Sequence, residues 1–296
     1  MKIAVLMGSN SPEREISIKT GEAVKKALLE MSYDVECIEF LDDFGSTIPK
    51  LSNCELVFNA LHGGIGENGT VQGLLECLKI PYTGSGRFAS SVCMNKHFSK
   101  TIVSQMGYKT PDWILLKKEE QIPHIDYFPV IVKPNSQGST VGLTLVENRV
   151  DLKKAIGHAF DYDEEVLLET FISGRELTVS IVGNEVLPIV EIIPSNRLYD
   201  YECKYSQGMS HYICSPKLSE NLSDEIKETG ENIYKKIGCT NYGRIDFRLN
   251  GDNIPWFLEV NTLPGMTGTS LLPMAAHEIG WSFEFLIETI VNEAMR

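Results

Sequence analysis

The chain has 296 residues, of which 43% are hydrophobic, and carries a formal net charge of -13 at pH 7. This length favours about two domains, and the hydrophobic content suffices for a sizeable buried core. The acidic balance, without a basic stripe, argues against a nucleic-acid partner. No apolar run is long enough to cross a bilayer, and the first residues lack a signal-peptide pattern, so we expect a cytoplasmic protein without a membrane partner.

The first third of the chain alternates short apolar runs with helical patterns. Runs typical of buried strands occupy 2–8, 34–40 and 56–63, and helical spacing is found at 16–31 and 70–79. Ser11 is the expected N-cap of the first helix, with Pro12 at its first helical position. This β-α-β alternation predicts a parallel sheet with crossover helices, that is, an α/β domain.

Glycine and serine residues at 81–96 interrupt this pattern and indicate a domain boundary. The later elements follow from hydrophobic periodicity. Helices are expected near 90–106, 149–160 and 220–237, and strands at 127–134, 141–146, 165–171, 176–183 and 185–193. The stretch 195–216 has an irregular aromatic and polar pattern. We therefore expect three domains, an N-terminal α/β domain at 1–84, a small central domain at 85–168, and a C-terminal domain at 169–296.

A hairpin with an Asn-Gly-Asp-Asn turn closes the C-terminal part of the predicted sheet. Alternation gives each of its strands an apolar face and a polar face. Pairing Leu249 with Ile254 places Asp246 opposite Phe257. Asp246 and Glu259 then become diagonal neighbours on one face, about 7–8 Å apart. A slip of one residue would send the two carboxylates to opposite faces of the hairpin.

Asp246, Glu259 and Asn261 offer two carboxylates and an amide oxygen from this hairpin. Such hard oxygen ligands suit Mg²⁺, which completes its coordination with water and substrate phosphates. Zinc would require His or Cys ligands, and none is adjacent. For an isolated hairpin, a salt bridge between Arg244 and Glu259 on a solvated face is the favoured alternative.

Two lysines are candidates for binding phosphate. Lys133 ends an apolar strand and enters the loop "PNSQGSTVGL", whose backbone N–H groups can close over phosphates. The loop lacks the G-x-x-x-x-G-K order of a P-loop. Lys96 would add a second cation. Taken singly, these residues fit an ordinary surface hairpin and a helix-surface lysine better.

Three glutamates stand at the ends of predicted strands. Glu169 closes a buried strand and Glu176 begins the next, a segment that can hold a purine between aliphatic walls. Glu13 lies just beyond the first strand, where ligands bind in open parallel sheets. A carboxylate there could pair with an ammonium group. The alternative for Glu13 is a helix N-terminal acid stabilised by the helix dipole.

Together these residues resemble the D-alanine–D-alanine ligases of the ATP-grasp superfamily, across essentially the whole chain. Seven ordered motifs carry the resemblance: "SPEREIS" (11–17), "HGGIGENGTVQG" (62–73), "PYTGSG" (81–86), "VKPNSQGSTVG" (132–142), "YDYECKY" (199–205), "GRIDF" (243–247) and "LEVNTLPGMTGTSLLPM" (258–274). The resemblance implies an ATP-grasp fold with ATP between the central and C-terminal domains. It also implies a homodimer that joins two D-alanine molecules for peptidoglycan synthesis.

The resemblance further implies a nucleotide site and a metal site. The residues that would bind ATP are Lys96, Lys133, Ser139, Glu169, Phe171, Ile172, Glu176 and Lys204. Those that would hold two Mg²⁺ ions, which Mn²⁺ could replace, are Asp246, Glu259 and Asn261. The stretch 195–216 would form a lid over the acyl phosphate intermediate.

Substrate and catalytic roles are implied in the same way. Glu13 would hold the ammonium group of the first D-alanine, and His62 would belong to the same substrate site. Arg244 and the backbone N–H of Gly265 would stabilise the oxyanion of the tetrahedral intermediate. Ser270 and Leu271 would receive the carboxylate of the second D-alanine. Ser139 and Tyr205 would link two mobile loops to Glu13 by hydrogen bonds.

Two positions depart from the family pattern. Thr170 stands where relatives often have a lysine near adenine, and Asn68 stands where "GEDG" is common. The alternatives are a related ligase that uses D-serine or D-lactate second, and a nucleotide-binding regulator without turnover. Tyr205 favours dipeptide formation, since ester-forming relatives often carry Phe there. Arg244 argues against the regulator, because nucleotide binding alone needs no oxyanion partner.

Overall fold

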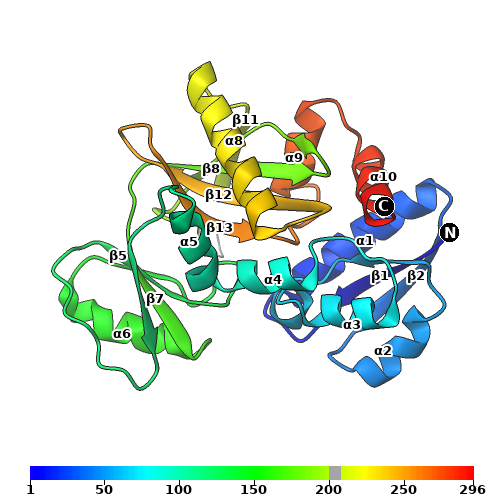
Figure 1. Cartoon of the computed structure of the whole chain (residues 1–296), viewed down its shortest axis with the longest axis horizontal. Helices are drawn as coiled ribbons and strands as arrows, with labels where there is room; N and C mark the ends of the chain where they lie inside the picture. Colours follow the sequence, from blue (N-terminus) through cyan, green and yellow to red (C-terminus); the bar gives the residue numbers. More distant parts are fainter. Residues whose placement is uncertain (200–207) are drawn as a thin grey trace.

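Three β-sheets organise the chain in the computed structural model, which describes residues 1–199 and 208–296. Figure 1 shows the N-terminal sheet in blue on the right, a sheet of green strands on the left, and the largest sheet between and above them. The α/β fold class expected from the sequence is confirmed. Among the helices of the two described ranges, none is both long and apolar enough to cross a membrane.

The first sheet is parallel, with the order β2-β1-β3, as predicted. Its strands are β1 (Lys2–Gly8), β2 (Asp34–Phe40) and β3 (Leu56–Asn59). The helices that accompany it are α1 (Arg14–Glu30), α2 (Phe44–Leu51) and α3 (Thr70–Leu78), with the 3-10 turn η1 (Gly64–Gly66). The third strand is shorter than the expected 56–63, because the chain turns into a loop after Asn59 and carries His62 away from the sheet.

The predicted start of the first helix was wrong. Glu13, not Ser11, occupies the N-cap position of α1, and the helix begins at Arg14. The Ser11 hydroxyl donates instead to the carbonyl oxygen of His62, at 2.6 Å. The same hydroxyl accepts from the Glu13 N–H at 3.2 Å, which precedes the helix, so it does not reach the N–H groups of the first turn that an N-cap side chain would bind. The shift leaves Glu13 at the carboxyl edge of the sheet.

The second sheet is antiparallel, with the order β4-β7-β5-β6. Its strands are β4 (Trp113–Lys117), β5 (Val130–Pro134), β6 (Thr144–Val146) and β7 (Glu165–Thr170), packed against α6 (Arg149–Phe160). The helix expected near 90–106 is two helices, α4 (Arg87–Met94) and α5 (Lys96–Gln105). Asn95 separates them with extended backbone, and its side chain caps α5 by accepting from the Phe98 N–H.

The third sheet is also antiparallel, with the order β11-β10-β8-β12-β13. Its strands are β8 (Arg175–Val182), β10 (Val190–Pro194), β11 (Ser210–Cys214), β12 (Tyr242–Leu249) and β13 (Pro255–Asn261), and β9 (Glu185–Val186) pairs with β8. The helix α8 (Glu220–Ile237) forms over the predicted range and packs on β8 and β12. Part of the stretch expected to be irregular forms β11.

The predicted register of the β12–β13 hairpin was also wrong. Asp246 lies directly opposite Glu259, and Phe247 pairs with Phe257, so Leu258 is an extra residue in a β-bulge. The bulge keeps Phe257 and Val260 both in the buried core and turns the intervening residues towards a cavity. Simple alternation cannot place two buried residues three positions apart on one strand.

The last two helices, α9 (Leu271–Glu278) and α10 (Phe283–Ala294), complete the core of the first sheet. Val24 of α1 and Ile290 of α10 are both fully buried in one hydrophobic cluster, and Figure 1 shows the two helices side by side. The ends of the chain therefore stabilise each other, and the third sheet is held against the first.

Candidate active site

Two cavities meet at the centre of the molecule. The first lies between the second and third sheets and the second opens towards the carboxyl edge of the first sheet. Four described residues line both cavities: Lys96, Gln137, Tyr199 and Glu259. Lys96 donates from Nζ to the Gln137 carbonyl oxygen at 2.6 Å, and its Nζ lies 3.5 Å from Glu259 Oε2. The shared wall thus carries both a cation and a carboxylate.

The first cavity has apolar walls and a charged end. Two guanidinium groups lie over the Phe171 ring, with the Cζ atoms of Arg197 and Arg248 at 5.5 Å and 5.4 Å from the ring centroid. Arg248 also donates to the Ile172 carbonyl oxygen at 3.2 Å and to Glu176 Oε2 at 3.3 Å. These contacts bring the predicted adenine and ribose residues together around one arginine that the sequence analysis missed.

The charged end of the first cavity contains Lys133 and Glu169. Lys133 donates from Nζ to Glu169 Oε1 at 3.0 Å, and both side chains are more than nine-tenths buried. Burial raises the pKa of Glu169, but the neighbouring Lys100 and Lys133 ammonium groups outweigh it and hold the pKa below its ordinary value. Thr170, the departure from the family pattern, lines the same cavity.

Asp246 and Glu259 bring the predicted metal ligands to the edge of this cavity. Arg244 donates to both Asp246 oxygens, from Nε and Nη2 at 2.8 Å each, and Thr178 donates to Oδ1 at 2.6 Å. Asn261 lines the second cavity, and its Oδ1 accepts from the Leu263 N–H at 3.0 Å. Arg244 thus pairs with Asp246, and not with Glu259 as in the alternative considered for an isolated hairpin. Burial lowers the pKa of Arg244, but the Asp246 carboxylate outweighs it and raises that pKa.

Glu13 and Ser139 meet in the second cavity, and the Ser139 hydroxyl donates to Glu13 Oε1. Two glycines make room for this carboxylate. A Cβ at Gly63 would lie 2.6 Å from Glu13 Oε2, and one at Gly138 would lie 2.9 Å from the same atom. A Cβ at either position would therefore displace the Glu13 carboxylate, and at Gly63 the φ of +68° also disfavours a side chain.

His62 is buried beside this site in a neutral form. Its Nδ1 lies 2.7 Å from the Leu61 carbonyl oxygen, so Nδ1 carries the proton. Its Nε2 lies 3.1 Å from Thr20 Oγ1, which can donate to it. Burial lowers the pKa of His62. Glu67, whose Oε1 lies 3.9 Å from His62 Nδ1, was not predicted as a site residue, although it stands in the motif "HGGIGENGTVQG". Burial raises the pKa of Glu67 to about 8.

The far wall of the second cavity is the loop that enters α9. Ser270 is the N-cap residue of α9, and its hydroxyl accepts from the Thr267 N–H at 3.0 Å. A Cβ at Gly265 would lie 2.9 Å from Ser270 Oγ and 3.6 Å from His62 Nε2. Leu271 lines the same wall. The predicted residues are thus adjacent here, whereas Lys204 and Tyr205 lie outside the described residues.

Comparison with known proteins agrees with this arrangement. Residues 102–292 match the profile described as "D-ala D-ala ligase C-terminus", and residues 41–85 match "D-ala D-ala ligase N-terminus". The D-alanine--D-alanine ligase of Aquifex aeolicus is 46% identical, over 99% of this chain and 100% of that protein. This chain belongs to the D-alanine–D-alanine ligase family. The resemblance seen in the sequence is confirmed.

Solved ligases of this family share the fold. The D-alanine--D-alanine ligase of Bacillus anthracis complexed with ATP has a TM-score of 0.89 and 35% identity, covering 100% of this chain and 98% of that one. The VanG D-Ala:D-Ser ligase of Enterococcus faecalis has a TM-score of 0.84 and 28% identity, covering 99% of each chain. The predicted ATP-grasp fold is confirmed, and members with different second substrates share it.

Proposed function

We propose that the chain joins two D-alanine molecules to D-alanyl-D-alanine for peptidoglycan precursor synthesis, with ATP converted to ADP and phosphate. The observation that carries this proposal is the shared wall of the two cavities. A nucleotide in the first cavity presents its γ-phosphate at Lys96 and Glu259. A substrate carboxylate bound in the second cavity then approaches that phosphate at the place where the two cavities meet.

ATP binding uses the two ends of the first cavity differently. The apolar wall, with Phe171 and Ile172, receives adenine, and Glu176 faces the ribose. The phosphates lie towards Lys133 and Lys96, which supply positive charge against an overall acidic protein. The roles of Ser139 and of Lys204 at the phosphates rest on the family resemblance.

The donor set at the hairpin fits magnesium. Asp246 and Glu259 face each other across the bulged hairpin, and Asn261 adds an amide oxygen. Across residues 1–199 and 208–296 no cluster of three or more His, Cys, Asp or Glu side chains offers a closed metal site. Two carboxylates, an amide and substrate phosphates are the ligands that Mg²⁺ accepts. When bound, two Mg²⁺ ions, or Mn²⁺ in their place, neutralise phosphate charge.

The first D-alanine binds with its ammonium group at Glu13, whose carboxylate is held by Ser139. One oxygen of its carboxylate attacks the γ-phosphorus, and the bond from that phosphorus to ADP breaks. The product is an acyl phosphate, a far better acyl donor than a carboxylate. The family resemblance assigns the stretch 195–216 as the lid that keeps water from this intermediate.

The second D-alanine binds with its carboxylate at Ser270 and Leu271, where the N-terminus of α9 favours an anion. Its neutral amine attacks the acyl carbon, and a tetrahedral oxyanion forms. Arg244 and the backbone N–H of Gly265 stabilise this oxyanion. Collapse of the intermediate breaks the bond to phosphate, the attacking nitrogen gives up one proton to the departing phosphate, and the dipeptide remains. Neutral His62, beside Gly265, lies where it can orient the substrate site.

The proposal extends to the organisation of the enzyme. We place the domain limits at 1–84, 85–168 and 169–296, near which the chain passes from one sheet to the next. We place the enzyme in the cytoplasm, where ATP is available, and expect a homodimer as the family resemblance implies.

The test is phosphate release from ATP with D-alanine, L-alanine, D-serine or D-lactate offered in turn. We expect release with D-alanine and the dipeptide as product. The D-Ala:D-Ser neighbour shows that the fold does not select the second substrate. Faster ligation of D-serine or D-lactate to D-alanine would therefore favour the alternative ligases. ATP binding without release under any condition would favour the regulator.

A further inference from the structure

Lys100 is a fully buried lysine that no step of the proposed reaction uses. It lies on α5, one helical turn after Lys96, with 0% of its side chain exposed. Burying an ammonium group is costly unless it is paired. Three different groups surround this one: Glu169 Oε2 at 2.7 Å, Thr110 Oγ1 at 2.8 Å, and the Trp113 ring with its centroid at 5.0 Å.

The pairing of strands explains why these groups meet. Glu169 of β7 lies between Trp113 of β4 and Ile131 of β5, and Lys133 is its diagonal neighbour on the same face. The two carboxylate oxygens of Glu169 are therefore divided, with Oε1 contacted by Lys133 and Oε2 by Lys100. Lys133 lines the first cavity, and Lys100 is absent from its lining residues.

The charges of this cluster matter for an anionic ligand. Lys133 paired with Glu169 alone would be a neutral pair, with little attraction for phosphate. A second ammonium group on the other oxygen leaves the cluster with one net positive charge. The extra charge is fixed by the fold, because the Thr110 hydroxyl that accepts from Lys100 donates in turn to the Phe257 carbonyl oxygen of β13 at 3.0 Å.

We propose that Lys100 is a positioning residue for the nucleotide site, which neutralises Glu169 from behind so that Lys133 keeps its positive charge for the phosphates of ATP. This inference rests on the proposed function, since it requires ATP in the first cavity. It assigns a role in the reaction to a residue that touches neither substrate.

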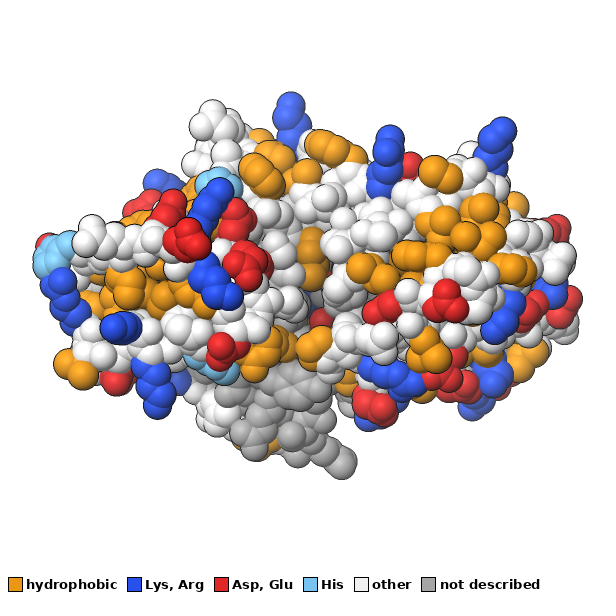
Figure 2. All heavy atoms as spheres, turned by 90° about the horizontal axis from the view of Figure 1, so that it is seen from below, with side chains coloured by type: hydrophobic (Ala, Val, Ile, Leu, Met, Phe, Trp, Pro, Cys, Tyr) orange, Lys and Arg blue, Asp and Glu red, His pale blue; other side chains and the backbone are white. Residues whose placement is uncertain are grey.

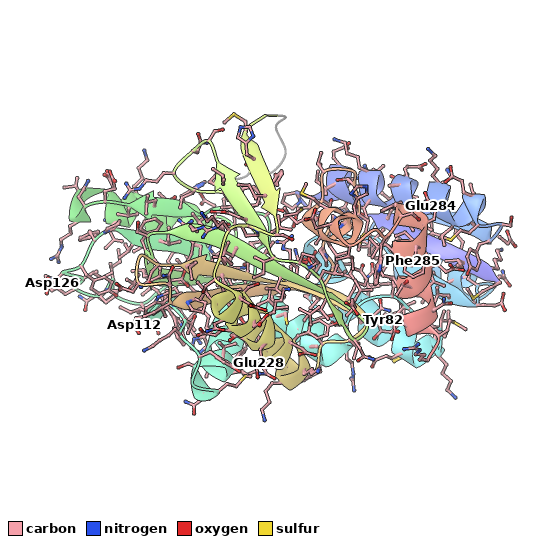
Figure 3. All side chains as sticks on the ribbon, turned by 90° about the horizontal axis from the view of Figure 1, so that it is seen from above. Tyr82, Asp112, Asp126, Glu228, Glu284 and Phe285 are labelled. Carbon is pink, nitrogen blue, oxygen red and sulfur yellow. The ribbon has the colours of Figure 1, made fainter. Side chains whose placement is uncertain are left out.

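The cluster is also titratable near physiological pH. Burial lowers the pKa of Lys100 to about 8, against the opposing effect of Glu169. The other charged groups that face it are Lys133 on β5 and Asp112, labelled in Figure 3, on the loop before β4. As the pH rises through this value the ammonium group loses its proton, and the cluster loses its net charge. ATP binding should then weaken.

The experiment compares wild type with Lys100→Met, and with Lys153→Met as a matched control on the exposed face of α6. We expect Lys100→Met to raise the KM for ATP, and the Kd for ADP by calorimetry, by about tenfold or more, with kcat changed far less. Lys153→Met should leave both constants within about twofold, since exposed charges are screened. Equal KM and Kd for wild type and Lys100→Met would overturn the proposal.

Two further readouts separate positioning from simple structural support. In wild type the Kd for ADP should rise above about pH 8, and in Lys100→Met it should stay flat, so the two values converge. The second readout is the ratio of kcat to KM for ATP in Lys100→Met, which should fall through KM and not through kcat. A wild-type Kd that is flat with pH, or a fall in kcat as large as the rise in KM, would contradict the proposal.

The wild-type measurements need no variant to fold, so the pH test stands even if Lys100→Met is unstable. They also separate this inference from the function on which it rests. If wild type neither binds ADP nor releases phosphate with D-alanine, the proposed function fails. If wild type does both and the Lys100 effects are missing, only the present inference fails.

Discussion

Asp246 and Glu259 are cross-strand partners, and their carboxylates have different neighbours. Arg244 and Thr178 hold both oxygens of Asp246, whereas Lys96 contacts Glu259 from the shared wall of the cavities. The exposed fraction of the Glu259 side chain is 30%, against 10% for Asp246. Glu259 is therefore the more accessible of the two proposed metal ligands.

Glu259→Gln should weaken the dependence of turnover on magnesium. The amide keeps the size of the side chain but removes a negative charge that attracts a hard cation. We expect half-maximal activity at a Mg²⁺ concentration at least about tenfold higher, with an unchanged melting temperature. Asp252→Asn, in the exposed turn of the same hairpin, is the matched control and should leave the Mg²⁺ titration unchanged. Identical titrations for wild type and Glu259→Gln would refute the metal assignment.

Gly63→Ala should impair binding of the first D-alanine. The added Cβ would lie 2.6 Å from Glu13 Oε2, and the φ of +68° disfavours any side chain. Displacing Glu13 by even about 1 Å should raise the KM for D-alanine. The value of kcat/KM should fall on the order of 10²-fold. Gly107→Ala is the control, because that φ is +85° and nothing lies within 4 Å. The idea would fail if both variants had the same steady-state kinetics.

Asn241→Ala should destabilise the fold more than Asn253→Ala does. Both residues have positive φ, of 65° and 58°, so both variants share the backbone cost. Only Asn241 is buried, where it accepts from the Gly84 N–H and donates to the Ile290 carbonyl oxygen, at 2.7 Å each. Leaving these groups unpaired should cost about 2 kcal/mol more. Urea unfolding measures the difference, and equal losses in the free energy of unfolding would contradict this reading.

Glu67→Gln should change how stability depends on pH. Because burial raises the pKa of Glu67 to about 8, the folded state retains a proton that the unfolded state loses near its ordinary value. The contribution of this carboxyl to the free energy of unfolding is therefore complete at low pH and is lost as the pH rises towards 8.

The glutamine variant cannot ionise, so its free energy of unfolding relative to wild type should increase between about pH 4.5 and pH 8 and then level off. Urea unfolding at several pH values tests this, with Glu288→Gln on the exposed side of α10 as control. A difference that is independent of pH would show that Glu67 is not buried as a neutral acid.

Much of the fold follows from local patterns. Apolar runs and helical spacing predicted all three strands of the first sheet, and the ranges of α6 and α8. The shared polar face of Asp246 and Glu259 was also predicted, although for the wrong register. The bulge at Leu258 could not be foreseen, because it is stabilised by the burial of Phe257 and Val260 against other elements.

Other parts of the site depend on tertiary contacts from the outset. Lys100 looks like a helix-surface lysine until the second sheet places a carboxylate against it. Arg248 could not be assigned to the site from the sequence either, because its partners near Phe171 are more than seventy residues earlier in the sequence. The strand β4 and the helix α10 were not predicted.

On the face drawn in Figure 2, charges of both signs are mixed, so net charge gives no guide to the site.

The sharing of one core by α1, α9 and α10 has a consequence for synthesis on the ribosome. The strand β1 (Lys2–Gly8) is made early, whereas the helix α10 (Phe283–Ala294) that packs in the same core is made only after the second and third sheets. Contacts of such long sequence separation form slowly. The nascent chain must therefore carry an uncovered apolar surface from the synthesis of β1 until the synthesis of α10, and chaperones that bind such surfaces can act in that interval.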